Sequence, residues 1–320
     1  MKKMKRIMII LAVVISCLFS VAMAQEKKIS VVTTIFPIYD WTREVIGENE
    51  NIDLTLLLDS GVDLHSFQPT AADIMKIATC DVFIYVGGES DEWVEDALHE
   101  AVNPNMIVLS LLEAMGEDIK MEEIVEGMEE EHDDDLDGED EEEADEHVWL
   151  SLRNAQKLVS AIAAVLGKAD HDHAETYLVN AADYANMLAA LDREYEEAVS
   201  NSTFKTVLFG DRFPFRYLTD DYSLNYYAAF SGCSAETEAS FETIVFLAKK
   251  VDEEKLPAVL TIEGTNHKIA ETIISATADK NQKLLTMNSM QGCTMHDVQA
   301  GVTYLSIMQE NFNVLEAALN

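Results

Sequence analysis

Two histidines stand where polar loops meet apolar segments, and their side chains suit a metal ion. His65 lies in the loop GVDLHSFQPT, which follows a predicted strand over residues 52–58. His147 directly precedes the apolar triplet VWL. Neutral imidazole nitrogens bind zinc and other borderline-soft divalent ions well. A fold that brings the two rings together makes a zinc site, whereas a lone loop histidine is usually an ordinary surface residue.

Other side chains with metal-binding chemistry leave alternatives open. Cys233 offers a thiolate to zinc or is simply a free buried cysteine, which is the commoner case. Cys293 and His296 follow a predicted strand over residues 283–287 and come near the same sheet edge. Three further histidines are expected at the surface, namely His171, His173 and His267.

Strands and helices alternate along the first part of the chain. Predicted strands cover residues 29–36, 52–58, 81–86 and 106–110, and predicted helices cover residues 37–46, 71–78 and 93–101. Alternation at this spacing is typical of a parallel sheet with helices on both faces. Ligands bind such sheets at the carboxyl ends of the strands, where His65 lies.

The alternation resumes after a long amphipathic pattern. Residues 154–166 form one predicted helix, and residues 171–199, which contain neither Gly nor Pro, form a second that is long enough to join two domains. Beyond it we predict strands over residues 206–209, 225–229, 258–262 and 283–287, and helices over 215–221, 240–251, 269–276 and 298–319. The fold class is therefore α/β, with two doubly wound parallel-sheet lobes joined by a single long helix.

The predicted domain boundaries follow from these elements. Residues 1–24 form a signal peptide, residues 25–168 the N-terminal lobe, residues 169–201 the linking helix and residues 202–320 the C-terminal lobe. Within the N-terminal lobe, the strongly acidic loop 117–146 is expected to be disordered because it cannot bury a core.

The start of the chain predicts export. A basic segment precedes an apolar run and the small-residue pattern Ala22-Met23-Ala24, which suits cleavage after Ala24. The alternative is a lipid anchor on Cys17 within VISC, so we expect a periplasmic or a cell-surface protein. Three cysteines remain after cleavage of the signal peptide. Their odd number and wide spacing do not predict a disulfide framework.

The strongly negative net charge of the chain indicates which classes of binding partner are disfavoured. The net charge of −37 argues against nucleic acid and against an anionic membrane surface. The acidic loop carries one histidine, His132, and serves either as a weak collector of cations or as a solvated tail without a binding role.

Several segments in order resemble the solute-binding proteins of zinc and manganese ABC importers. They are SVVTTIFPIY from residue 30, GVDLHSFQPT from residue 61, CDVFIYVGGESDEWV from residue 80, DEHVWLS from residue 145 and YLSIMQEN from residue 304. The resemblance covers nearly the whole mature chain. It implies two α/β lobes bridged by a long helix, in agreement with the pattern of elements.

The resemblance also implies a ligand set. His65 and His147 fall on positions where the family binds its metal, and Asn288 falls near the fourth ligand. The third ligand, a His or Glu, aligns with Arg212, which has no lone pair to give. Glu263, at the end of a predicted strand, is expected to complete the site or to pair with Arg212. The predicted ligands are therefore His65, His147, Glu263 and Asn288.

The function implied is a receptor, not an enzyme, that captures Zn²⁺, or alternatively Mn²⁺, between two lobes and delivers it to an ABC permease with its ATPase. We expect a monomer that does not bind nucleic acid. Two alternatives are a surface adhesin of the same fold and a metal-dependent hydrolase, since two histidines and a carboxylate also describe catalytic zinc.

Overall fold

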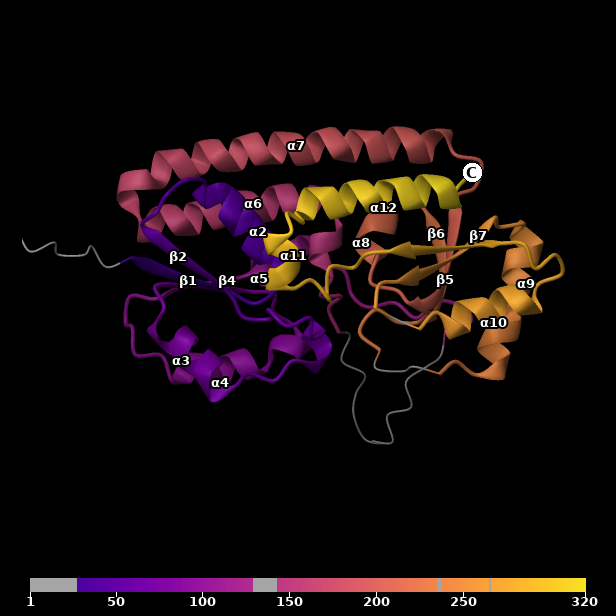
Figure 1. Ribbon diagram of the computed structural model, residues 1–320, viewed down its shortest axis with the longest axis horizontal. Coiled ribbons are helices and arrows are strands. Elements are labelled where there is room, and N and C mark those ends of the chain that lie inside the picture. The colour runs from indigo at the N-terminus through magenta and orange to yellow at the C-terminus, as the bar shows by residue number, and fades with distance from the viewer. Residues whose placement is uncertain (1–27, 129–142, 235–237, 265) are drawn as a thin grey trace, which may run out of the picture.

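The computed structural model describes residues 28–128, 143–234, 238–264 and 266–320. The predicted signal peptide, Cys17 and His132 lie outside these residues. Figure 1 shows two α/β lobes side by side, with long helices running across the top of both.

The N-terminal lobe is built on a parallel sheet of strand order β2-β1-β3-β4. Its strands are β1 (Ile29–Thr33), β2 (Ile52–Leu56), β3 (Val82–Tyr85) and β4 (Ile107–Ser110). Its helices are α2 (Phe36–Ile46), α3 (Ala71–Thr79), α4 (Trp93–His99) and α5 (Leu111–Met115). Thr70, directly before α3, caps this helix with a reciprocal capping box to Asp73.

The C-terminal lobe repeats this plan with strand order β6-β5-β7-β8, again all parallel. Its strands are β5 (Thr206–Arg212), β6 (Asn225–Phe230), β7 (Ala258–Ile262) and β8 (Lys283–Met287). Its helices are α8 (Arg216–Asp221), α9 (Phe241–Glu254) and α10 (Lys268–Ala276). The predicted α/β class with two parallel-sheet lobes is confirmed.

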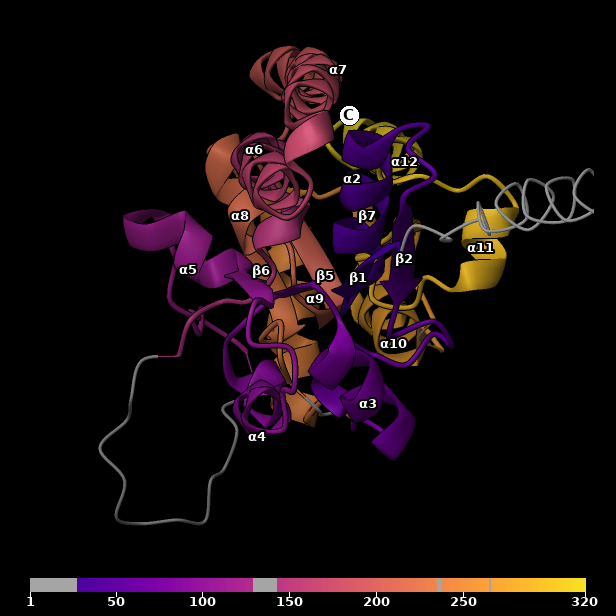
Figure 2. The same ribbon diagram turned by 90° about the vertical axis from the view of Figure 1, so that its left-hand side faces the viewer.

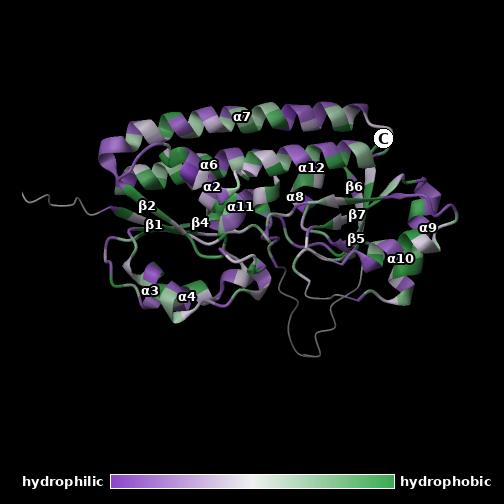
Figure 3. Cartoon of the chain, in the orientation of Figure 1, coloured by the Kyte–Doolittle hydropathy of each residue, from purple (hydrophilic) through white to green (hydrophobic). Residues whose placement is uncertain are grey.

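The lobes are joined by α6 (Leu152–Ala169) and the long helix α7 (Ala174–Asn201), which packs on α6, α2 and α12. At 1.5 Å per residue, α7 is about 42 Å long. Its buried residues recur every three or four positions and include Tyr184, Leu188, Leu191 and Tyr195. Figure 3 shows hydrophobic and hydrophilic residues alternating along α7, as expected of a helix with one buried face.

The chain returns to the N-terminal lobe after β8. Met295 N–H donates to the Asp59 carbonyl, and the short helix α11 (Met295–Gln299) therefore lies against the first lobe, as Figure 2 shows. The final helix α12 (Tyr304–Ala318) begins there, where the Asp40 carboxylate accepts a hydrogen bond from Tyr304 N–H. Residues between β8 and α12 thus cross the boundary between the lobes.

The prediction of one closing helix over residues 298–319 was wrong. Gly301, with φ at 92°, interrupts the helical backbone conformation between α11 and α12. Thr303 then starts α12 with a capping box to Ser306. A left-handed glycine followed by a strong N-cap ends one helix and begins another, although the apolar spacing continues through both.

Both ends of the acidic loop have defined positions. Met121 and Ala144 form an antiparallel bridge, and Asp145 and Glu146 are buried. Residues 129–142 lie outside the described part of the chain. None of the helices in the described residues is both long enough and apolar enough to span a membrane.

Candidate metal centre

His65 is held beside the N-terminal sheet by a short 3-10 turn, Leu64–Ser66. The Asp63 carboxylate starts this turn by accepting a hydrogen bond from the His65 N–H at 3.1 Å. The Nδ1 atom of His65 lies 2.7 Å from the Ser90 hydroxyl oxygen. A partner on Nδ1 fixes the ring and leaves Nε2 as the nitrogen available to a metal.

His147 is held by the residue two positions before it. The Asp145 carboxylate accepts from the His147 backbone N–H at 2.9 Å and lies 3.0 Å from its Nδ1. The side chain of His147 is fully buried. The following Trp149 anchors the segment, because its indole N–H donates to the carbonyl of Ser289 in the C-terminal part of the chain at 2.9 Å.

The two rings meet through the nitrogens that these contacts leave available. The Nε2 atoms of His65 and His147 are 3.2 Å apart. A tetrahedral zinc ion bound by two imidazoles at about 2.0–2.1 Å separates their nitrogens by about 3.3 Å. The structure therefore brings together the two histidines at the spacing that a shared zinc ion needs.

Cys233 joins this pair from the C-terminal lobe, in the segment that follows β6. One ligand atom each from His65, His147 and Cys233 lies within 4.8 Å of the others. The preceding Gly232 makes the approach feasible, because a Cβ there lies only 2.9 Å from His147 Cε1 and 3.0 Å from the Phe213 carbonyl oxygen. The cluster thus takes side chains from both lobes.

The electrostatic environment shifts the pKa values of the two imidazoles in opposite directions. Burial, together with the positive charge of His147, lowers the pKa of His65 to about 3, so that the ring is neutral at pH 7 and one of its nitrogens has a lone pair to offer. Burial also opposes the charged form of His147, but the hydrogen bond to Asp145 and the charges of Asp145 and Glu146 outweigh it and raise the pKa. Burial raises the pKa of the Cys233 thiol, and the nearby carboxylate of Glu122 adds to the shift.

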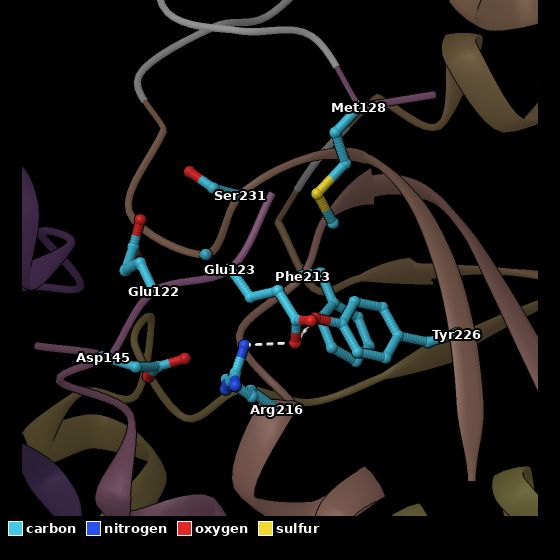
Figure 4. A pocket seen from close by; sticks show the side chains of 9 residues that line it. Glu122, Glu123, Met128, Asp145, Phe213, Arg216, Tyr226 and Ser231 are labelled. Atoms are coloured by element: carbon cyan, nitrogen blue, oxygen red, sulfur yellow. Dashed lines mark hydrogen bonds and ion pairs between the residues drawn. The ribbon is translucent and has the colours of Figure 1, made fainter. Parts of the chain in front are cut away.

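Carboxylates surround the cluster without belonging to it. Glu146 is buried, accepts from Ser90 N–H at 2.8 Å and has its other oxygen 3.7 Å from His65 Nδ1. Burial raises the pKa of Glu146 to about 7. Figure 4 shows a small adjoining pocket whose lining includes Glu122 and Asp145. These acids favour a cation at the site.

Arg212, which the resemblance places at a ligand position, forms an ion pair across the two lobes. One guanidinium nitrogen of Arg212 lies 2.7 Å from an Asp63 carboxylate oxygen, and the other is 3.4 Å from the Ser234 carbonyl. The described residues show no ion pair between Arg212 and Glu263. Arg212 therefore joins the C-terminal lobe to the turn that carries His65.

The structure places the side-chain oxygens of Glu263 and Asn288 in other hydrogen bonds. The Glu263 carboxylate accepts from both the N–H and the hydroxyl of Ser289, each at 2.7 Å. The Asn288 side-chain oxygen accepts from Met290 N–H at 2.7 Å. Their role as metal ligands stays a prediction.

The remaining candidates lie apart from this cluster. Cys293 is a buried free thiol, and burial raises its pKa to about 12. His296 is exposed on α11, and His173 lies 2.9 Å from an Asp170 oxygen. His171 is exposed, and His267, at φ 54°, precedes α10.

Sequence reasoning missed Gln291. Its side-chain Nε2 lies 3.1 Å from Nε2 of His65 and 3.0 Å from Nε2 of His147. A glutamine carries no distinctive ligand signal on its own. Its position after the β8 strand end, beside Cys293 and His296, is the feature that points to the sheet edge where the site lies.

Comparison with known proteins gives matches along nearly the whole chain. A zinc-binding lipoprotein of Streptococcus pneumoniae, AdcA, is 32% identical over 98% of this chain, which spans 61% of that relative's length. The high-affinity zinc uptake system protein ZnuA of Bacillus subtilis is 29% identical, over 92% of this chain and 89% of its own.

A solved structure shares the fold. The Zn(II)-bound ZnuA-like domain of Streptococcus pneumoniae AdcA superposes with a TM-score of 0.71 at 28% identity, over 91% of this chain and 99% of that domain. The family model described as zinc-uptake complex component A, periplasmic, matches residues 31–318. With this match and a fold of two bridged α/β lobes, the chain belongs to the ZnuA family of solute-binding proteins.

Proposed function

We propose that this chain is an exported receptor that binds one Zn²⁺ ion between its lobes through His65, His147 and Cys233. The observation that carries the proposal is the cluster itself, in which the two imidazole Nε2 atoms are 3.2 Å apart and the cysteine lies within ligand reach. The names of the similar proteins, which include zinc-binding and zinc-uptake proteins, support it.

The donor atoms favour zinc over manganese. Thiolate and imidazole suit zinc, whereas Mn²⁺ prefers carboxylate, carbonyl and water oxygens. The metal must displace the proton of the Cys233 thiol, whose pKa burial raises, so binding releases protons and weakens in acid. The same neighbouring acids that disfavour a lone thiolate offset the charge of a bound divalent cation.

The partner is an ABC permease driven by its ATPase, to which the receptor delivers its zinc. The receptor is either periplasmic or held at the cell surface by Cys17. Support comes from the description of the family as a periplasmic component of a zinc-uptake complex and from the lipoprotein name of a similar protein. The adhesin and hydrolase alternatives stay predictions, and the site geometry favours neither.

Calorimetric titration of the chain with Zn²⁺ and Mn²⁺ tests the proposal. We expect one zinc per chain, tighter than manganese, and a loss of at least about tenfold in zinc affinity for His65→Ala. His296→Ala, which changes an exposed histidine outside the cluster, is the matched control and keeps wild-type affinity. Absence of zinc binding, or equal binding by His65→Ala, contradicts the proposal.

A further inference from the structure

We propose that Gln291 supplies the fourth zinc ligand through its side-chain oxygen, and that Ser289 and Glu263 hold it in that orientation. This inference rests on the proposed zinc-binding function. It assigns a metal-facing role to a residue whose type alone does not suggest one, and it gives Glu263 a supporting part.

The first argument is the shape of the donor set. The side-chain Nε2 of Gln291, the terminal amide atom that faces the site in this structure, lies 3.1 Å from Nε2 of His65 and 3.0 Å from Nε2 of His147, and those two imidazole nitrogens are 3.2 Å apart. Three donors at the corners of a zinc tetrahedron lie about 3.3 Å from one another. The three positions thus match one face of such a tetrahedron, and the Cys233 sulfur lies within 4.8 Å of a ring nitrogen of each histidine.

The second argument is burial. Gln291 is 8% exposed and Ser289 is fully buried. A buried carboxamide needs partners for both its oxygen and its nitrogen. Ser289 is itself fixed, because its carbonyl accepts the Trp149 indole N–H at 2.9 Å, next to His147. The amide therefore stands on a rigid part of the site and not on a free loop.

The third argument is a count of protons on Ser289. Its hydroxyl oxygen lies 2.7 Å from a Glu263 carboxylate oxygen and 3.3 Å from the Gln291 side-chain oxygen. A hydroxyl has one proton, and the shorter contact to a carboxylate is the stronger bond. Ser289 then has a lone pair, and no proton, to offer Gln291.

A half-turn of the Gln291 amide satisfies every group. Its nitrogen then donates to the Ser289 hydroxyl oxygen, while its oxygen faces the two imidazoles with lone pairs available to zinc. With the nitrogen inward, as in this structure, the amide instead donates to the imidazoles, and a metal ion replaces those bonds. Glu263 thus acts through Ser289 to orient a neutral oxygen ligand.

The test is zinc affinity measured by competition with a chromophoric chelator. We expect Gln291→Ala to weaken binding about 10- to 100-fold and Ser289→Ala about tenfold. Gln291→Glu, which keeps an oxygen at the same reach and adds charge, binds zinc at least as tightly as the wild type. Gln299→Ala changes an exposed glutamine on α11 and leaves affinity unchanged.

A crystal structure of the zinc-loaded wild type and of Gln291→Glu gives an independent reading if an alanine variant fails to fold. We expect the Gln291 oxygen about 2.0–2.2 Å from zinc. Wild-type affinity in both alanine variants, or a zinc ion that the Gln291 oxygen does not touch, overturns the inference while leaving the proposed function intact. Failure of the wild type to bind zinc overturns the proposed function itself.

Discussion

The Nε2 atoms of His65 and His147 lie 3.2 Å apart, and each ring is fixed from behind through its Nδ1 by a different group. A serine hydroxyl contacts the Nδ1 of His65, whereas a carboxylate contacts the Nδ1 of His147. The carboxylate partner makes the imidazole of His147 the more basic ligand. Burial and the charge of His147 lower the pKa of His65, whereas the hydrogen bond and charge of Asp145 outweigh burial and raise the pKa of His147.

Asp145→Asn removes the charge behind His147 but keeps the shape of the side chain. We expect zinc affinity to fall about 10- to 100-fold, because this partner both orients the ring and raises its basicity. Chelator competition measures the loss. Asp172→Asn, at an exposed position, provides the comparison, and equal affinity in both variants contradicts the role assigned to Asp145.

Gly232→Ala forces a methyl group against His147, since its Cβ lies 2.9 Å from the ring Cε1. The ring or the strand end must shift, so we expect weaker zinc binding by at least about tenfold, as for other disturbed ligand supports. Gly292→Ala adds a Cβ with nothing within 4 Å and should bind as the wild type does. Unchanged binding by Gly232→Ala means that this close approach is not needed.

The ion pair between Arg212 and Asp63 joins the two lobes beside the site. Burial opposes the Asp63 charge, but Arg212 outweighs it and holds the pKa of Asp63 below its usual range. This stability is present above the ordinary aspartate pKa and is lost as pH falls through the lowered value. A double-mutant cycle with Arg212→Gln and Asp63→Asn in urea should give a coupling of about 0.5–2 kcal/mol at pH 7. A coupling energy of zero contradicts a stabilising role for this ion pair.

The contribution of Asp91 to folding stability depends on pH in the opposite sense. Its carboxylate accepts the N–H groups of Val86 and Gly87, yet burial dominates and raises its pKa to about 6. The folded state therefore holds the proton more tightly than the unfolded state. The Asp91 contribution to stability is present below about pH 4 and is lost as pH rises towards 6, by up to about 3 kcal/mol.

Urea denaturation between pH 4 and 6 checks this sign. Asp91→Asn cannot ionise, so its stability should fall less with rising pH than that of the wild type. Asp96→Asn, at an exposed position on α4, should follow the wild-type curve. Parallel curves for Asp91→Asn and the wild type contradict the buried-carboxyl argument.

The fold was largely predictable because its signals are local. Each strand of the two sheets is a short apolar run, and the buried positions of α7 repeat with helical spacing. The division of the last helical segment was not predictable, because the apolar spacing of α11 and α12 is continuous. Gly301 and Thr303 nevertheless separate the two helices. Nor does the pattern show that the segment after β8 crosses back to the first lobe.

The site was predictable only in part. His65 and His147 were found by residue type and by resemblance, and the structure brings them together. The sequence leaves open whether Cys233 is a ligand or a buried free cysteine, because its approach to the histidines depends on Gly232 and on packing between the lobes. Gln291 was missed, since an amide becomes a ligand candidate only when tertiary contacts aim it at two imidazoles.

X-ray absorption at the zinc edge of the loaded chain tests the central claim most directly. It reports the atoms bound to zinc without any substitution. The account predicts two imidazole nitrogens and one sulfur at about 2.3 Å, with the sulfur lost in Cys233→Ser. A zinc ion surrounded by oxygens alone, or a sulfur signal that persists in Cys233→Ser, contradicts a site built from His65, His147 and Cys233.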